Sequence, residues 1–257
     1  MTEKSCDFQD FDSFWLDYST RFLNTEASAS LVFRGAADSE YDLKPSIGRT
    51  TEKHAKNGIE TLERLIMDEF KRLAAAELDK TPETDWEWLF LAQHYGLPTR
   101  LLDWSTNPLV ALYFAIEQYD DKDGLIYYTQ ASIQDKYELF SPYTANYVNP
   151  PKMSTVRHLG NALFVRPKYT DRRYLNQQSV FACSPNPFEP LNMEGLQKIT
   201  FSRKLKPKLR RVLRTLGVST SFIYPGIGGI AADAKNSQFD LIKDESINAF
   251  YLMTYAK

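Results

Sequence analysis

Eight polar side chains gather in one short stretch of the sequence, at a place where the chain must change direction. The stretch runs from Leu91 to Ala115 (LAQHYGLPTRLLDWSTNPLVALYFA) and connects two apolar segments. Polar groups are costly to bury without partners, and binding groups concentrate on loops that rigid elements hold in place. We therefore treat these residues as candidates for binding a polar ligand: Gln93, His94, Tyr95, Thr99, Arg100, Asp103, Ser105 and Thr106.

Local signals predict the elements that position these side chains. Asp85 to Tyr95 has the apolar spacing of a helix, Gly96 offers a left-handed cap, and Pro98 prevents continuation. Thr99 to Trp104 is short and bracketed by helix breakers, which predicts a strand. A second helix should follow at once, because the Asn-Pro pair at 107–108 supplies an N-cap and a proline for the first helical position.

This arrangement places Ser105 and Thr106 just before a helix N-terminus. Free N–H groups and the positive end of the helix dipole lie there, a setting that suits a phosphate or a ribose hydroxyl. A structural interpretation competes with this one. In that interpretation Asn107 and Ser105 only cap the helix, Asp103 only pairs with Arg100, and His94 is a satisfied, partly buried histidine.

Two further segments carry similar chemistry. Phe33-Arg34-Gly35 ends a predicted strand, with an arginine for a bidentate grip on phosphate and a glycine that lets a ligand approach the backbone. Asn176-Gln177-Gln178-Ser179 leads into another predicted strand. Each segment also has a simpler interpretation, because strand-end arginines often pair with carboxylates and glutamine pairs often face solvent.

Several chemistries are excluded by the motifs that the sequence lacks. There is no GxxxxGK[ST] or GxGxxG phosphate loop, no HExxH and no GxSxG elbow. The three histidines (54, 94 and 158) and two cysteines (Cys6 and Cys183) are too scattered to predict a metal site or a disulfide framework. What remains is a set of Arg, Ser, Thr, Gln and aromatic residues, which suits phosphate and ribose recognition.

Composition predicts a cytoplasmic globular protein. The chain has 257 residues, 43% hydrophobic and 25% charged, with a net charge of −2. No apolar run approaches the roughly 20 residues that cross a bilayer, so we expect no membrane partner. The acidic start (MTEKSCDFQDFDSFW) is unlike a signal peptide.

One segment is strongly basic. Residues 203–214 carry seven basic side chains and no acid, which predicts a contact with nucleic acid. The alternative is the solvated face of a helix, since Leu209, Val212 and Leu213 supply an apolar face. The seven basic residues are Arg203, Lys204, Lys206, Lys208, Arg210, Arg211 and Arg214.

The rest of the chain reads as a single domain with an α+β fold, because helices lead in the first half and strands follow in the middle. We expect a core of about 25–240, with an N-terminal helix at 8–24 packed on it and an irregular loop at 141–156. The other predicted helices are 60–78, about 207–216 and about 227–235. The other predicted strands are 30–35, 124–129, 161–166, 178–183, 197–202 and 247–253.

Three of these motifs together resemble the FRG domain family: Phe33-Arg34-Gly35, the run AQHYGLPTRLLDWSTNPLVALYFA and the segment NQQSVF. The resemblance covers residues 31–181, and the later segment YPGIGGIAADA (224–234) is similar to the usual ending of the family.

A more distant resemblance is to ADP-ribosyltransferases of the arginine-serine-glutamate type. These enzymes have an aromatic-Arg-Gly strand, then a Ser-Thr-Ser strand and helix, then a strand with the catalytic glutamate. The resemblance implies a split mixed or antiparallel sheet with flanking helices, and NAD as co-substrate. It implies catalytic roles for Arg34, Ser105 and the glutamine pair Gln177 and Gln178. We add Asp103 to the catalytic candidates because it lies two residues from Ser105. The expected NAD contacts are Phe33, Gly35, Gln93, His94, Tyr95, Thr99, Arg100 and Thr106.

The sequence departs from that pattern because glutamine stands at the third position. An amide can bond a ribose hydroxyl but cannot accept a proton, so Asp103 is the candidate base. One hypothesis is an NAD-dependent mono-ADP-ribosyltransferase, a toxin of a bacterial toxin–antitoxin or anti-phage defence system, with an antitoxin protein as partner and RNA, DNA or protein as acceptor. The other is a non-catalytic module that binds a nucleotide or nucleic acid in the same pocket.

Overall fold

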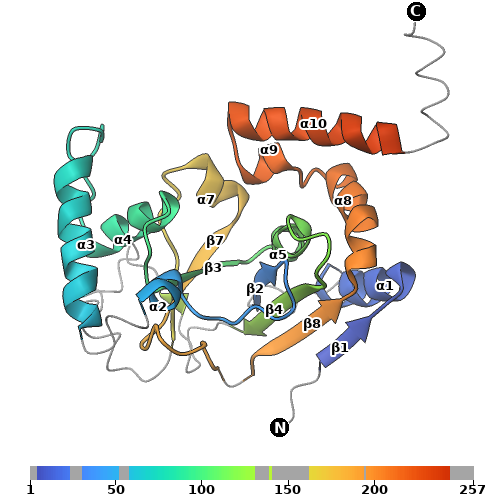
Figure 1. Cartoon of the computed structure of the whole chain (residues 1–257), viewed down its shortest axis with the longest axis horizontal. Coiled ribbons are helices and arrows are strands. Elements are labelled where there is room, and N and C mark those ends of the chain that lie inside the picture. Colours follow the sequence, from blue (N-terminus) through green and yellow to red (C-terminus); the bar gives the residue numbers. More distant parts are fainter. Residues whose placement is uncertain are drawn as a thin grey trace, which may run out of the picture.

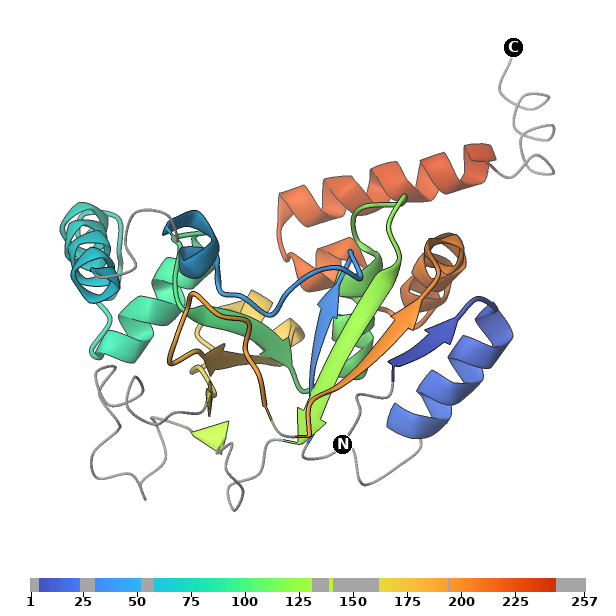
Figure 2. The same cartoon turned by 60° about the horizontal axis from the view of Figure 1, so that its bottom comes forward.

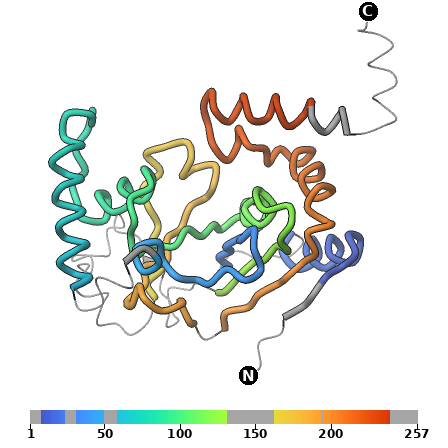
Figure 3. Tube along the Cα trace, in the orientation of Figure 1, coloured from blue at the N-terminus to red at the C-terminus, as the bar shows by residue number. Residues whose placement is uncertain are grey.

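A computed structural model describes residues 5–23, 31–51, 58–130, 139–140, 162–193 and 195–243 (Figure 3). Within these residues the fold is α+β, as predicted, because the strands form one sheet and the helices do not alternate regularly with them. The predicted loop at 141–156 and the predicted strand at 247–253 lie outside the described residues.

The strands are β1 (Ser5–Phe8), β2 (Leu31–Ala36), β3 (Leu101–Ser105), β4 (Gly124–Gln130), β5 (Leu139–Phe140), β6 (Leu163–Val165), β7 (Ser179–Cys183) and β8 (Gln197–Phe201). The helices are α1 (Phe11–Phe22), α2 (Ser46–Thr51), α3 (Ile59–Ala74), α4 (Asp85–His94), α5 (Pro108–Ile116), α7 (Arg172–Asn176), α8 (Lys206–Thr215), α9 (Thr220–Ile223) and α10 (Ile227–Lys243). A short 3-10 turn, Arg203–Leu205, leads into α8.

The strand order of the sheet is β1-β8-β4-β2-β3-β7-β6-β5. From β8 to β6 every neighbouring pair is antiparallel, whereas the two edge strands, β1 and β5, pair in parallel with their neighbours. The sheet is therefore mixed around an antiparallel centre. In Figure 1, α1, α5 and α8 lie around the half that contains β2, β4 and β8, and α3 and α4 lie beside the other half.

The centre of the sheet is nearly split. Strand β2 pairs with β4 along its whole length, from Leu31↔Gln130 to Ala36↔Leu125, and β3 pairs with β7 from Leu101↔Cys183 to Ser105↔Ser179. Between β2 and β3 only Phe33 and Ser105 are in register. The two strands diverge from this point, as Figure 2 shows. The divergence leaves backbone groups of β3 without a ladder partner on this side.

Apolar residues from α1, α5 and α8 build the core over the first half of the sheet. Phe14, Tyr18 and Phe22 of α1 are buried there, so the N-terminal helix packs on the core as predicted. Phe22 contacts Phe33 edge to face, with ring centroids 5.0 Å apart. Such pairs stabilise a core beyond their buried area alone.

The sequence misplaced the start of the first helix and missed β1. The helix begins at Phe11 because Asp10 accepts a hydrogen bond from the Ser13 amide (2.9 Å), which is an N-cap. The residues before it form β1 (Ser5–Phe8), which pairs with β8, about 190 residues later in the chain. No local signal indicates a pairing at that separation. The short helices α2, α7 and α9 were not predicted either.

Candidate functional site

A small pocket of about 130 Å³ opens where β2 and β3 diverge, with α5 and α7 as its other walls. Three of the segments singled out in the sequence contribute to it: Phe33-Arg34-Gly35 from β2, Asp103 to Ser105 from β3, and Gln177 after α7. The complete lining is Phe33, Arg34, Gly35, Asp103, Trp104, Ser105, Val110, Ala111, Phe114, Arg173 and Gln177.

Arg34 lies in the split of the sheet. Its side chain is 14% exposed, and Nη1 donates a hydrogen bond to the backbone oxygen of Asp103. The guanidinium thereby satisfies a β3 carbonyl that a regular ladder would have bonded. The Asp103 carboxylate lies 3.8 Å from Nη1, and Tyr41 accepts a longer bond of 3.5 Å from Nη2. The Nε atom is buried and has no hydrogen-bond partner among the described residues.

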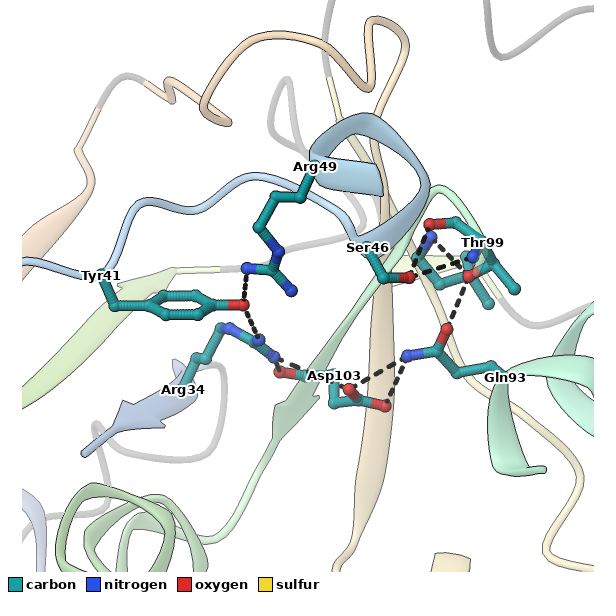
Figure 4. A network of polar contacts seen from close by, with 8 residues as sticks. Arg34, Tyr41, Ser46, Arg49, Gln93, Thr99 and Asp103 are labelled. Carbon is teal, nitrogen blue, oxygen red and sulfur yellow. Dashed lines mark hydrogen bonds and ion pairs between the residues drawn. The ribbon is translucent and has the colours of Figure 1, made fainter. Parts of the chain in front are cut away.

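A chain of polar contacts continues from Arg34 to α4 and α2 (Figure 4). The Asp103 carboxylate, 57% exposed, accepts bonds from Gln93 Nε2 at 3.1 and 3.3 Å. Gln93 Oε1 accepts a bond from the Thr99 hydroxyl at 2.6 Å, and the backbone of Thr99 exchanges bonds with the Ser46 hydroxyl. The chain therefore holds the Asp103 carboxylate in place.

The Ser105 hydroxyl links β3 to the residue after α7 and to the N-cap of α5. It donates to the backbone oxygen of Gln177 at 2.6 Å and accepts from the Asn107 amide at 2.9 Å. Asn107 in turn accepts from the Leu109 amide at 2.9 Å and caps α5, as predicted. Both hydrogen-bonding functions of this buried hydroxyl are thus engaged, which fits the structural interpretation of Ser105.

The structure distinguishes the two adjacent glutamines. Gln177 is buried, lines the pocket and donates from Nε2 to the Ile223 oxygen at 3.0 Å. Gln178 has a positive φ of 45°, is exposed, and accepts from the Thr106 hydroxyl at 3.2 Å. Gln177 is therefore the one of the two glutamines that lines the pocket, and Gln178 and Thr106 lie outside its lining.

Two lining residues have roles other than the expected ligand contact. The Phe33 side chain is completely buried in the core. Gly35 allows close approach, but of helix α5: a Cβ atom added there would lie 1.8 Å from the Ala111 oxygen. The short residue is needed for the packing of strand against helix rather than for a ligand.

Arg100 and Tyr95 do not reach the pocket. Arg100 is 1% exposed and forms an ion pair with Glu63 of α3, with Nη2 2.5 Å from Oε2, and it donates to the Ser184 and Pro185 oxygens. The alternative in which it pairs with Asp103 is therefore incorrect. Tyr95 is 69% exposed and lies beyond the end of α4. Thr99 and Gln93 act through the contacts described above and do not line the pocket.

His94 also lies outside the pocket lining. Its ring contacts Tyr95 and Tyr174 edge to face, and its buried Nδ1 has no hydrogen-bond partner among the described residues. Burial lowers the pKa of His94, and the positive charge of Arg173 lowers it further. With its Nδ1 unpartnered, His94 is not the satisfied histidine that the structural interpretation expected.

Sequence reasoning missed Arg173 and three residues of α5, Val110, Ala111 and Phe114, as lining residues. Arg173 lies in the five-residue helix α7, whose one local signal is the N-cap Asp171, which accepts a bond from the Arg173 amide. The Arg173 guanidinium lies over the Tyr224 ring, 5.0 Å from its centroid. Tyr224 donates to Glu117 at 3.1 Å, and burial raises the pKa of that carboxyl.

A larger cavity of about 660 Å³ lies between α3 and α4, yet it fits the predicted chemistry less well. Four carboxylates line it, from Glu60, Glu63, Asp68 and Asp85, against two cations. An excess of negative charge disfavours a phosphate. We therefore identify the smaller pocket as the candidate site.

The basic run at 203–214 is only partly available for a partner. Lys206 is completely buried and donates from Nζ to the oxygens of Ala37, Gln118 and Tyr119 at 2.7 to 3.0 Å. Arg210 donates to the Ile116 oxygen and pairs with Asp120. These cations hold the chain that follows α5. Four members remain exposed: Arg203, Lys204, Lys208 and Arg211.

Within the described residues, no three His, Cys, Asp or Glu side chains group in a way that could hold a metal ion. The same part of the chain contains no helix both long and apolar enough to cross a membrane.

One comparison with known proteins gives a match. Residues 29–124 match the model of the FRG domain family, a range that includes Arg34, Asp103 and Ser105 but not Arg173 or Gln177. No curated protein and no solved structure matches the chain. The matched range contains β2, β3 and α5, which form most of the pocket. The chain therefore contains an FRG domain.

Proposed function

We propose that the pocket is the NAD site of a mono-ADP-ribosyltransferase. One observation carries the proposal: Arg34, Ser105 and Gln177, from three separate segments, line the same pocket at the split of the sheet. That is the order and context in which transferases of the arginine-serine-glutamate type use their three motifs. A pocket of about 130 Å³ is smaller than the roughly 300 Å³ of complete ligand sites. It would therefore enclose one part of the dinucleotide, with the rest lying outside.

In the proposed reaction the bond between ribose C1′ and the nicotinamide nitrogen breaks, and neutral nicotinamide leaves with the bonding electrons. A nucleophilic oxygen or nitrogen of the acceptor then bonds to C1′ and loses a proton. Arg34 would orient the phosphate side of NAD. The Gln177 amide oxygen, which no hydrogen bond from the described residues uses, would accept from the ribose 2′-hydroxyl. Preorganised dipoles of this kind stabilise a charged transition state.

Asp103 is the proposed proton acceptor. It is the acidic residue in the pocket lining, and its exposed carboxylate can face an acceptor in solvent. Gln93 and Arg34 already bond this residue, which holds it in one orientation. Nucleic acid is a candidate acceptor through the exposed cations Arg203, Lys204, Lys208 and Arg211, and protein is the other. A toxin role, an antitoxin partner and a cytoplasmic location belong to the same proposal.

A second candidate function is a non-catalytic module that binds a nucleotide or nucleic acid. Hydrogen bonds within the protein favour it, because they already occupy two polar groups of the pocket. The Ser105 hydroxyl bonds the Gln177 oxygen and the Asn107 amide, and the Gln177 amide donates to the Ile223 oxygen. An amide at this position cannot take a proton, so binding without turnover would be its expected property.

Labelled NAD, incubated with the full chain and total cellular RNA, DNA and protein, separates the two functions. Transfer of label and release of nicotinamide, both lost in Arg34→Ala and kept in Arg172→Ala, support the transferase. Arg172 is the matched control because it is an exposed arginine of α7, next to the pocket residue Arg173, and does not itself line the pocket. NAD binding with neither release nor transfer supports the binding module, and no interaction with NAD contradicts the proposal.

A further inference from the structure

We infer that Arg173 is a second anion-binding residue of the pocket, and that Arg34 and Arg173 together bind the diphosphate group of the ligand. This inference rests on the proposed function for the identity of the ligand as a dinucleotide. The two guanidinium groups come from β2 and α7, and both line the pocket of about 130 Å³. Arg173 lies outside the residues that match the FRG domain family.

The first argument is unused hydrogen-bonding capacity. Arg173 is half-buried, yet its guanidinium donates no hydrogen bond and forms no ion pair within the described residues. Arg34 keeps a buried Nε without a partner. Guanidinium groups present several donors in a fixed plane, and the buried Nε of Arg34 costs free energy while it lacks a partner. A ligand with several acceptor oxygens, such as a diphosphate, would satisfy both residues.

The second argument is charge. Two guanidinium groups and one carboxylate, that of Asp103, face the pocket, so its lining has a net charge of +1. The Asp103 carboxylate lies 3.8 Å from Arg34 Nη1, is 57% exposed and accepts hydrogen bonds from Gln93. No carboxylate among the described residues forms an ion pair with Arg173. Burial raises the pKa of Glu117 and the charge of Arg173 lowers it in part, but that carboxylate accepts a hydrogen bond from Tyr224 and does not line the pocket, so an anion in the pocket would complete the site. Guanidinium groups bind phosphate oxygens in strong, charge-assisted hydrogen bonds.

The third argument is that Arg173 is held in position. Its guanidinium lies 5.0 Å from the centroid of the Tyr224 ring, a cation–π contact. Tyr224 is fixed by its bond to Glu117 and by ring contacts with Phe114 and Tyr113. Without this contact, the Arg173 side chain would lose conformational entropy when it became ordered on ligand binding. The stacking fixes the group before the ligand arrives, and pre-organisation of this kind increases affinity.

Helix α7 itself is anchored to the same segment. Asn176 donates to the Phe222 oxygen at 2.7 Å, and Gln177 donates to the Ile223 oxygen at 3.0 Å. The residues just before Tyr224 therefore hold the C-terminal end of the helix that carries Arg173. In this way Phe222, Ile223 and Tyr224 support the pocket through positioning rather than through contact with the ligand.

The experiment measures binding of ADP-ribose, inorganic pyrophosphate and adenosine to the full chain by calorimetry. We expect Arg173→Gln to weaken ADP-ribose and pyrophosphate at least tenfold, which is about 1.4 kcal/mol, and to leave adenosine unchanged. Arg172→Gln removes the same charge from the adjacent position of the helix and should change each affinity less than twofold. The pyrophosphate affinity of Arg173→Lys should lie between those of Arg173→Gln and Arg172→Gln, because lysine keeps the charge but not the planar fork of the guanidinium.

Tyr224 is tested as a positioning residue with two variants. Tyr224→Phe keeps the ring under Arg173 and should retain most of the affinity for pyrophosphate. Tyr224→Leu removes the ring and should therefore lose most of the affinity for pyrophosphate. A merely structural role would instead lower the melting temperature in both variants without changing the ratio of pyrophosphate to adenosine affinity.

The outcomes separate this inference from the proposed function. If the chain consumes NAD or binds ADP-ribose and Arg173→Gln changes neither affinity nor rate, the inference is overturned and the proposed function stands. If pyrophosphate binds in an Arg173-dependent way but NAD and ADP-ribose do not bind, the anion site stands and the proposed function fails. Absence of binding by both phosphate ligands overturns the inference.

Discussion

Phe33 and Ser105 are the one residue pair in register between β2 and β3, and this pair joins the two halves of the sheet. From this pair, at the C-terminal end of β3, the two strands diverge, and the Arg34 guanidinium bonds the Asp103 oxygen in place of the missing ladder. The pocket exists because of this divergence. A residue that serves both the sheet and the pocket has to be tested with variants that separate the two roles.

The close packing of β2 against α5 predicts a large effect of a single methyl group. Gly35→Ala places a Cβ atom 1.8 Å from the Ala111 oxygen, which is backbone and cannot rotate away. We expect a loss of about 3 kcal/mol or more in the free energy of unfolding, because overpacking forces the helix from the strand. Urea denaturation measures it.

Gly228→Ala is the matched control for that variant. Gly228 lies in α10, and a Cβ atom there meets nothing within 4 Å. Alanine should leave stability unchanged or raise it by up to about 1 kcal/mol. Equal effects of the two substitutions would contradict the packing role of Gly35.

Ser105 is predicted to act mainly through the fold. Ser105→Ala removes the bond to the buried Gln177 oxygen and the bond from the Asn107 amide. Leaving these groups without partners should cost about 1–3 kcal/mol in thermal or urea unfolding. Thr106→Ala, which removes one exposed contact with Gln178, should cost less than about 1 kcal/mol. A Ser105→Ala protein of normal stability that no longer binds NAD would instead assign Ser105 to the ligand.

The ion pair between Arg100 and Glu63 fixes α3 to the sheet. Glu63→Gln leaves a guanidinium that is 1% exposed without its carboxylate, and breaking a buried pair in this way costs about 3–5 kcal/mol. Glu69→Gln, on the same helix, breaks an exposed pair with Arg72 and should change stability little. The midpoint of chemical denaturation should therefore be clearly lower for Glu63→Gln than for Glu69→Gln. Similar midpoints would refute the role of the Arg100–Glu63 pair in holding α3.

Stability should fall in acid because of Asp233. Burial raises the pKa of this carboxyl, but hydrogen bonds from Ser221, Ser219 and the Thr220 amide outweigh it and hold the pKa at about 2. The folded-state pKa lies below the unfolded value of about 3.9, so the stabilisation is present above pH 4 and is lost as the pH falls towards 2.

The test is the dependence of unfolding free energy on pH between 2 and 6. Asp233→Asn should lower stability at pH 6 and flatten the profile between pH 4 and 2. Asp121→Asn is the control, because that exposed residue accepts no hydrogen bond from the described residues. An unchanged profile in Asp233→Asn would show that the contacts between α9 and α10 are not governed by this carboxylate.

The sequence alone determined the elements around the site, because their signals act within a few residues. Gly96 adopts φ 81° after α4, Thr84 and Glu87 form a capping box at its start, and Asn107 caps α5. The sequence also singled out Arg34, Ser105 and the pair Gln177-Gln178 as candidates for one site, and Arg34, Ser105 and Gln177 line one pocket in the structure.

The tertiary structure alone decided which of several similar residues lines the pocket. Arg34 bonds a residue 69 positions away, Ser105 a residue 72 away, and Arg100 a residue 37 away. Local patterns cannot assign partners at these separations, so the pairing of Arg100 with Glu63 was missed. Likewise one backbone torsion turns Gln178 outward while Gln177 stays buried. These choices depend on how the sheet divides, which no segment of the sequence determines by itself.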